Sequence, residues 1–170
     1  MKTPIQDELA YGNGLPDYRT ELTDNRRTVK WVKNEIRYKV YGKCRVWSKD
    51  NKMQSCRRMW KCKVLSNEES TIDFKIGICK PGNWNTTNIY TERKDSYQDL
   101  NLSYERTRRF YDNKVKVGDI ITILLIQNDK LWFKQNDKIV GLPINVSSGF
   151  DPCCLMIAFN SNTTLQLLGE

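Results

Sequence analysis

The sequence contains no histidine among its 170 residues. Serine-histidine-aspartate and cysteine-histidine catalytic sites both use an imidazole as the general base, so both kinds of site are excluded. Metal sites that use histidine ligands are excluded for the same reason. We therefore expect a protein that is not an enzyme and has no catalytic residues.

Long hydrophobic runs are also missing. Nothing approaches the roughly 20 consecutive apolar residues that a membrane span requires, and residues 1–14 hold no apolar stretch of the kind found in a secretory signal. We expect a protein of the cytoplasm, or of the nucleus, that does not enter a membrane. In those compartments its six cysteines are expected to be reduced thiols.

The cysteine spacing is unlike that of a zinc site. Cys44, Cys56, Cys62 and Cys79 include no pair separated by two residues, and no histidine is present to complete a ligand set. Cys62 and Cys79 fall where strand alternation points inward, and small thiols are common in protein cores. We expect no metal, no cofactor and no disulfide.

Positive charge is concentrated in one part of the chain. The net charge is +8, and residues 26–63 hold 14 lysines and arginines against two acidic residues. Such a field attracts nucleic acid, an acidic protein or a membrane surface, although basic side chains more often cover the solvated face of strands. Nucleic-acid binding through residues 26–63 is therefore the alternative function.

Short segments rich in Val, Ile, Tyr, Trp and Thr, separated by Asn, Asp, Gly and Ser, indicate strands and turns without a long helix. The candidate strands are Thr28–Lys33, Glu35–Tyr41, Arg45–Trp47, Arg58–Leu65, Ile72–Cys79, Gly118–Ile126, Lys130–Lys134, Lys138–Leu142, Cys153–Asn160 and Thr163–Leu168. Many short strands without intervening helices favour a β-sandwich. We expect one domain over residues 21–170, preceded by an arm at residues 1–20 that is poorly ordered or docks at a sheet edge.

Two segments show the alternation of a strand with one buried face. In Ile72–Cys79 every second residue is apolar, and in Met59–Val64 the alternation directs Trp60, Cys62 and Val64 inward.

The stretch from Gly118 to Gly141 contains three apolar runs separated by two identical polar tetrads, QNDK at 127–130 and at 135–138. Asn and Asp tolerate positive φ and hydrogen-bond to their own backbone, so both tetrads suit tight turns. The pattern predicts a three-stranded meander. Its first strand, Ile120–Ile126, is almost continuously apolar, as expected for a strand covered on both sides.

Residues 80–116 are polar, and their aromatic residues are scattered rather than periodic. A long segment of this kind within a compact domain is usually functional or mobile. We interpret it as surface loops that include one or two short strands at most.

Five segments resemble, in order, the pattern of a SPRY domain with the amino-terminal PRY extension found in many tripartite-motif proteins. They are LTDNRRTVKW at 22–31, MWKCKV at 59–64, FKIGIC at 74–79, the stretch 117–144 that opens with VGDI and closes with GLPI, and residues 149–168. The likeness covers residues 20–168. Phe74 stands where the family usually has tryptophan, Lys61 where it has an acid, and Asp137 where it has the turn glycine.

The resemblance implies a bent antiparallel β-sandwich of the concanavalin-A-like, jelly-roll kind, with partner-binding loops at one end. It also implies a non-catalytic protein-interaction module, such as the substrate-recognition part of a larger protein of the ubiquitin-ligase or innate-immune type. We expect a monomeric domain that binds a protein or peptide, with an acidic ligand as one option.

Binding surfaces depend on a few aromatic or arginine anchors, and position in loops suggests two groups of candidates. The first group, within residues 80–116, consists of Trp84, Tyr90, Tyr97, Tyr104, Arg106 and Arg108. The second group, in a loop that varies within the resembled family, consists of Trp47 and Lys49. On a strand, the i, i+2 spacing of Arg106 and Arg108 would aim both side chains the same way.

Overall fold

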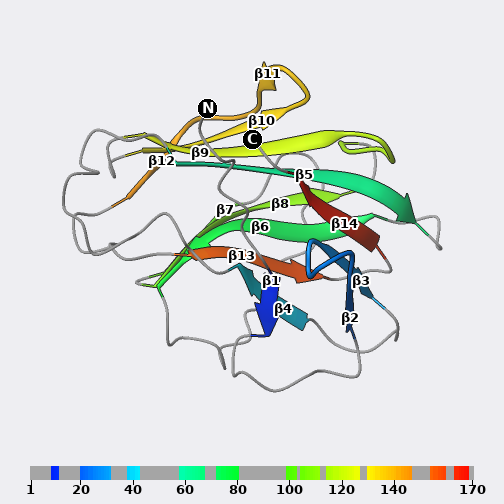
Figure 1. Cartoon of the computed structure of the whole chain (residues 1–170). Coiled ribbons are helices and arrows are strands. Elements are labelled where there is room, and N and C mark those ends of the chain that lie inside the picture. The colour runs from blue at the N-terminus through cyan, green and yellow to red at the C-terminus, as the bar shows by residue number, and fades with distance from the viewer. Residues whose placement is uncertain are drawn as a thin grey trace, which may run out of the picture.

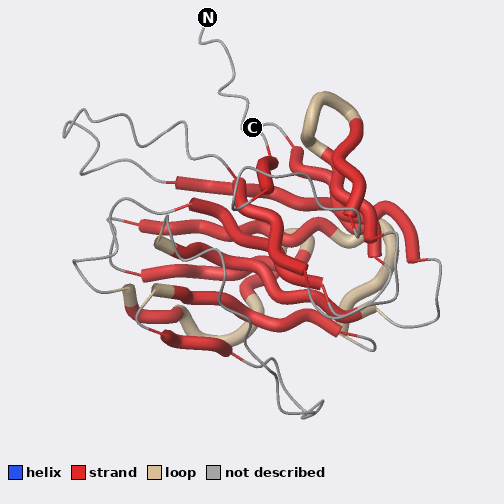
Figure 2. Tube along the Cα trace, turned by 90° about the horizontal axis from the view of Figure 1, so that it is seen from below, coloured by secondary structure: helices blue, strands red, loops and turns tan. Residues whose placement is uncertain are grey.

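The computed structural model describes residues 9–11, 20–31, 38–42, 58–67, 72–80, 99–102, 104–111, 114–126, 130–146, 154–159 and 163–168. Every helix or strand in these residues is a β-strand, and the strands form two antiparallel sheets packed face to face (Figure 1 and Figure 2). The all-β sandwich predicted from the sequence is confirmed. In these ranges no helix is long and apolar enough to cross a membrane.

The first sheet has six strands in the order β1-β4-β13-β6-β8-β7. Their bounds are β1 (Leu9–Tyr11), β4 (Tyr38–Gly42), β13 (Cys154–Phe159), β6 (Asp73–Cys79), β8 (Glu105–Tyr111) and β7 (Asp99–Leu102). Strand β13 comes from the C-terminal part of the chain and pairs with both β4 and β6. Segments far apart in sequence therefore lie side by side.

The second sheet has eight strands in the order β11-β10-β9-β5-β14-β3-β2, with β12 paired beside β10. Their bounds are β11 (Lys138–Ile139), β10 (Lys130–Gln135), β9 (Ile120–Ile126), β5 (Arg58–Asn67), β14 (Thr163–Leu168), β3 (Thr28–Trp31), β2 (Thr20–Thr23) and β12 (Ile144–Asn145). The predicted meander is present as β9, β10 and β11.

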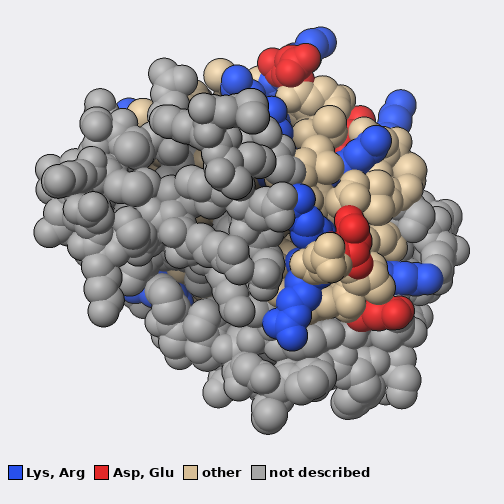
Figure 3. All heavy atoms as spheres, in the orientation of Figure 1, with Lys and Arg blue, Asp and Glu red and all other residues tan. Residues whose placement is uncertain are grey.

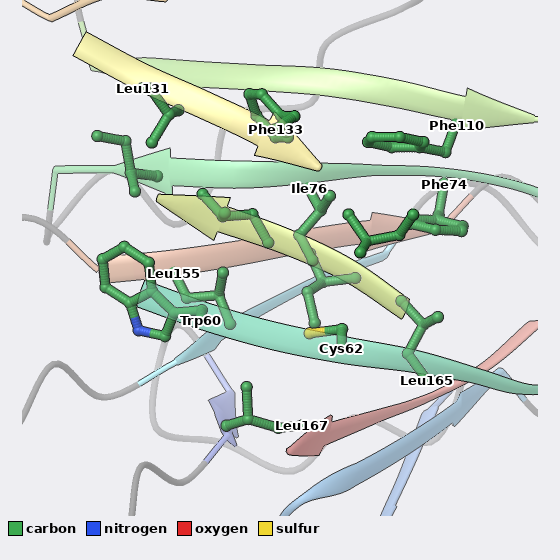
Figure 4. Packing of buried hydrophobic residues seen from close by; sticks show 14 of the residues in the cluster. Trp60, Cys62, Phe74, Ile76, Phe110, Leu131, Phe133, Leu155, Leu165 and Leu167 are labelled. Atoms are coloured by element: carbon green, nitrogen blue, oxygen red, sulfur yellow. The ribbon is translucent and has the colours of Figure 1, made fainter. Parts of the chain in front are cut away.

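Side chains from the facing surfaces of the two sheets form one core (Figure 4). The predicted inward positions of Trp60, Cys62 and Val64 are confirmed, because none of the three is more than 5% exposed. The aromatic ring of Phe110 lies 5.8 Å from that of Phe74 within its own sheet and 6.0 Å from that of Phe133 in the other. Ring pairs at this separation contribute about 0.5–1.5 kcal/mol beyond the area they bury.

Strand β6 differs from its prediction, because both of its faces are buried. Lys75, on the face turned away from the core, is only 1% exposed. Its Nζ lies 2.5 Å from Oε1 of Glu105, and Asp73 pairs with Arg109 at 2.6 Å. A buried charge is tolerated only when it is paired and hydrogen-bonded. The polar members of the alternation are therefore interior residues neutralised by the neighbouring β8.

The segment interpreted as surface loops contains β7 and β8, and β8 is not at the surface. All of β8 except Arg106 is buried, and the strand lies between β6 and β7. Its sequence, ERTRRFY, has three arginines. A hydrophobicity pattern therefore gives no sign that this strand is buried. The prediction of surface loops is wrong for residues 105–111.

Part of the predicted N-terminal arm adds a strand to the first sheet. Strand β1 pairs with β4 at the sheet edge, and the Leu9 side chain is fully buried in the common core. The Leu9 N–H donates to the carbonyl of Arg26 in the β2–β3 turn, at 2.8 Å. Strand β1 therefore also joins the two sheets.

The second polar tetrad forms a turn that also supports the loop before β9. Asn136 has a positive φ of 57°, as the sequence predicted for this tetrad. Asp119 accepts hydrogen bonds from Lys116 N–H at 2.9 Å, from Gln135 Nε2 at 2.8 Å and from Asn136 Nδ2 at 3.2 Å. Residues 127–129 of the first tetrad, and the predicted strand at 45–47, lie outside the described residues.

These hydrogen bonds set the ionisation of Asp119. Partial burial by itself would raise the pKa of this carboxyl, but the bonds from Lys116 N–H, Asn136 and Gln135 and the Lys116 charge outweigh it and lower the pKa. A lowered folded-state pKa stabilises the fold above the unfolded-state pKa of about 3.9, and this contribution is lost as the pH falls through the folded-state pKa.

We predict that Asp119→Asn lowers the free energy of unfolding by about 1 kcal/mol at neutral pH, the usual contribution of a hydrogen bond. Urea unfolding of both proteins from neutral to strongly acidic pH should show this difference shrinking as Asp119 of the wild type becomes protonated. A difference that stays constant over this range would contradict a role for the Asp119 charge.

Gly77 is required by the close approach of β6 and β8. A Cβ placed on Gly77 would lie 2.1 Å from the carbonyl oxygen of Arg106 and 2.7 Å from Cα of Thr107. Both are backbone atoms of a central strand. The clash cannot be relieved by turning a side chain.

We predict that Gly77→Ala lowers the free energy of unfolding by about 3 kcal/mol, the upper range for overpacking, as measured by urea denaturation. Gly118→Ala is the matched control, because Gly118 has a positive φ of 97° but no atom near its added Cβ. It should cost only the backbone strain of about 1 kcal/mol. Equal losses in the two variants would show that β6 and β8 can separate.

Candidate functional site

The structure describes three of the eight predicted binding residues. Tyr104 directly precedes β8, and Arg106 and Arg108 lie within it. The other five, which lie outside the described residues, are Trp84, Tyr90, Tyr97, Trp47 and Lys49. Their participation in a binding surface stays a prediction.

The register brings the starts of two long connections to one end of the six-stranded sheet. Strands β4 and β6 both pair antiparallel with β13, so they run in the same direction and end together, at Gly42 and Cys79. The chain enters residues 43–57 and 81–98 from this end. These two connections contain the five candidates outside the described residues.

Tyr104 lies at the same end of the sheet. It precedes β8, whose first residue, Glu105, is paired with Cys79. The Tyr104 carbonyl accepts a hydrogen bond from Lys80 N–H at 2.8 Å, and its side chain is half-buried. This half-buried aromatic residue lies beside the start of residues 81–98 and at the same end of the sheet as the start of residues 43–57, so it is well placed to border a surface formed at that end.

Arg108 is only 2% exposed and makes structural contacts within the protein, while its predicted contact with a partner stays a prediction. Its Nε and Nη2 donate to the Asp99 carboxylate at 2.6 and 3.0 Å. Its Nη1 donates to the Val140 carbonyl and its Nη2 to the Leu142 carbonyl, each at 2.6 Å. The guanidinium also lies 4.8 Å from the ring centre of Phe133. These contacts join β7 and β8 of one sheet to residues 140–142 beside the other.

Arg106 points to the same side of β8, as its spacing from Arg108 predicted, and it makes a similar link. Its Nε donates to the Asn145 carbonyl in β12 at 3.1 Å, and its Nη1 donates to the Glu105 carbonyl at 2.8 Å. Partial burial lowers the pKa of the Arg106 guanidinium. We call Arg106 and Arg108 the arginine bridge, because together they fasten the edge of the six-stranded sheet to residues 140–145.

The arginine bridge holds an apolar loop that the sequence analysis did not single out. Leu142 is 81% exposed and Ile139 is 56% exposed. Gly141 has a φ of 74°, and a Cβ there would lie 2.8 Å from Arg108 Nη1. Any other residue here would be strained by the positive φ and by contact with the guanidinium. The sequence signal was the glycine-leucine-proline run at 141–143, which is part of the stretch that resembles the family pattern.

The distribution of charge among the described residues is mixed on the face turned to the viewer in Figure 1. Figure 3 shows this face, where lysine and arginine side chains alternate with acidic and uncharged ones rather than forming one basic surface. Trp60, from the basic segment 26–63, is 5% exposed and lies in the core. Its ring is therefore not available to stack on a base.

Two further observations concern reactive groups. Cys62 and Cys79 are both buried. In the described part of the chain, no group of three or more Cys, Asp and Glu residues is arranged to hold a metal ion.

We predict that Arg108→Ala lowers the free energy of unfolding by about 3 kcal/mol, because it removes a buried guanidinium that donates two hydrogen bonds to Asp99 and two to backbone carbonyls. Arg108→Lys should fall between this variant and the wild type, since an ammonium group cannot bond Asp99 and both carbonyls with the geometry of a guanidinium. Arg26→Ala, at an exposed arginine of the β2–β3 turn, is the control. Urea denaturation measures the stability of each variant. Hydrogen exchange of the backbone amides at residues 140–145 should be faster in Arg108→Ala than in the wild type. A fully stable Arg108→Ala protein would show that the sheets close without the bridge.

Comparison with solved structures identifies the fold. The chain is similar to the Drosophila melanogaster neuralized NHR1 domain (TM-score 0.64, 8% identity, covering 98% of this chain and 99% of that one). It is also similar to the TRIM65 PSpry domain (0.56, 11%, 96% and 90%) and to the human HERC1 SPRY domain (0.50, 15%, 87% and 91%). No protein-family model and no curated protein matches the sequence. The chain has the fold of SPRY domains and of the SPRY-like NHR domain, as its sequence pattern predicted.

Proposed function

We propose that this protein is a non-catalytic protein-interaction module whose loops at one end of the sandwich bind a partner protein or peptide. The observation that carries the proposal is the SPRY-type fold, which extends over nearly the whole chain. SPRY-like domains are generally interaction modules. The arrangement of the six-stranded sheet supports the proposal, because the chain enters both long connections from the end where Tyr104 lies.

Aromatic residues are the chemical basis of this proposed surface. Trp84, Tyr90 and Tyr97 lie in one connection, and Trp47 with Lys49 lies in the other. Tryptophan, tyrosine and arginine contribute a disproportionate share of binding energy at protein interfaces. The tryptophan and tyrosine side chains bury a large area with few rotatable bonds. The sequence resemblance makes substrate recognition within a larger protein of ubiquitin-ligase or innate-immune type the context we propose, with the domain monomeric and in the cytoplasm or nucleus.

We predict that the double variant Trp84→Ala/Tyr97→Ala loses capture of partner proteins while its thermal unfolding midpoint stays that of the wild type. Truncating two interface anchors is expected to weaken binding about tenfold or more. Affinity capture followed by mass spectrometry, with wild type and variant compared, is the measurement.

Val117→Ala is the control for this experiment, because Val117 is an exposed apolar residue at 53% in the loop after β8, away from the end where β8 begins. It should retain full capture. If the double variant retains its partners as well, the proposed loop surface is wrong. If the wild type captures no partner at all, the proposed function itself fails.

A further inference from the structure

The outer face of the eight-stranded sheet combines apolar and basic residues. Strand β10 carries Lys130, Trp132 and Lys134 at alternate positions, while Leu131 and Phe133 between them are fully buried in the core. The first three side chains therefore point away from the core. Lys130 is exposed, and Trp132 and Lys134 are half-buried. In Figure 1 this face is the top of the molecule, formed by β5, β9 and β10.

Neighbouring strands extend this pattern across the sheet. Trp132 is paired with Leu124 of β9, and Leu124 with Met59 of β5, so the three form an apolar row. All three are half-buried. The sequence predicted β9 to be covered on both sides, whereas Leu124 and Ile126 on this side keep part of their surface in water. The apolar surface that this strand leaves in water is suited to be buried by another polypeptide segment.

Lysines lie on both sides of the apolar row. Lys134 and Lys61 are each paired with Thr122 in the next row, and Lys130 is paired with Ile126 in the row on the opposite side. Strands β5, β9, β10 and β14, which make up the centre of the sheet, contain no aspartate or glutamate.

The charges on this face differ from those of the interior. Lys75, Arg108 and Arg109 each form an ion pair with a carboxylate. Among the residues that the structure describes, Lys61, Lys130 and Lys134 form none. Three uncompensated positive charges around an apolar row create a surface whose electrostatic complement is acidic.

We propose that this face binds an extended acidic segment of a partner protein, with an apolar side chain of that segment on Trp132 and acidic side chains beside Lys130 and Lys134. We call it the lysine-flanked face and define it by Met59, Lys61, Leu124, Lys130, Trp132 and Lys134. The inference rests on the proposed function, since it assigns the same protein-binding module a second surface and a chemical class of partner.

Spacing along the strand specifies the ligand further. Alternate residues of a strand lie about 6.8 Å apart on one face, so Lys130, Trp132 and Lys134 match an extended segment with acidic, apolar and acidic residues at alternate positions. Single-stranded nucleic acid instead binds best where several aromatic rings stack successive bases. Trp132 is the one aromatic residue in the described part of β5, β9 and β10 that points outward. The apolar row therefore favours a peptide.

The test uses a short fluorescein-labelled peptide in which a glutamate stands two residues before and two residues after a central leucine, measured by fluorescence anisotropy. Binding should weaken about tenfold in the double variant Lys130→Glu/Lys134→Glu, because attraction becomes repulsion. The matched control is Arg26→Glu/Lys138→Glu, which makes the same change of charge at two exposed residues off this face. Lys138 is paired with Gln135, whose side chain points to the other side of the sheet from that of Lys134. The control should bind like the wild type.

A charge-swapped peptide separates binding from loss of folding. If Lys130→Glu/Lys134→Glu is folded and the face is the site, the same peptide with lysines in place of its glutamates should bind this variant better than it binds the wild type. A peptide with its two glutamates moved next to the leucine should bind the wild type more weakly. Trp132→Phe should retain binding, and Trp132→Ala should lose it.

Several results would overturn the proposal. They are equal binding by the two double variants, failure of the charge-swapped peptide, and tighter binding of an oligothymidylate than of the acidic peptide. These outcomes are distinguishable from failure of the proposed function. If partner capture depends on Trp84 and Tyr97 but not on Lys130 and Lys134, the loops bind partners and the lysine-flanked face does not.

Discussion

One buried guanidinium connects the two sheets along an edge of the sandwich. Arg108 is held by the Asp99 carboxylate and by two carbonyls of the loop beside β12. A charge in this position must have all its hydrogen-bonding partners supplied by the protein, because water is excluded. This requirement constrains the neighbouring chain: β7 provides the acid, Val140 and Leu142 provide carbonyls, and Gly141 leaves room for the group beneath it. The positions of β7, β8 and residues 140–145 are therefore mutually dependent.

The same principle organises the other side of the six-stranded sheet. Lys75 pairs with Glu105, and Asp73 with Arg109, across the adjacent strands β6 and β8. Removing one partner of such a pair leaves an uncompensated buried charge, so substitution of a single partner is expected to be strongly destabilising. The charged interior coexists with an ordinary apolar core on the facing side, where Phe74, Phe110 and Phe133 meet.

These charged strands also mark the limit of what the sequence predicted. Periodicity located the strands whose buried side chains are apolar, such as Trp60, Cys62 and Val64 on β5, and turn chemistry located Asn136. Periodicity failed for β8, since arginine is normally a surface residue. No feature of the local sequence shows that Arg108 and Arg109 pair with Asp99 and Asp73. For the arginine bridge, the sequence predicted only that the Arg106 and Arg108 side chains point to the same side of a strand. Its burial depends on long-range register, which hydrophobic alternation along one strand does not contain. The lysine-flanked face was missed likewise, because its lysines come from strands that only the folded sheet brings together.

In the loop above the arginine bridge, the main chain and the side chain of adjacent residues have different roles. Its anchorage uses the main-chain carbonyls of residues 140 and 142, whereas the Leu142 side chain stays in water. A Cβ at position 141 would press on the Arg108 guanidinium, whereas the side chain at position 142 meets mostly water. Sequence variation there would change the chemistry of a protruding tip while its shape stayed constant. The backbone of the loop is thus held in place while its exposed side chain can vary, and such variation carries little penalty for folding.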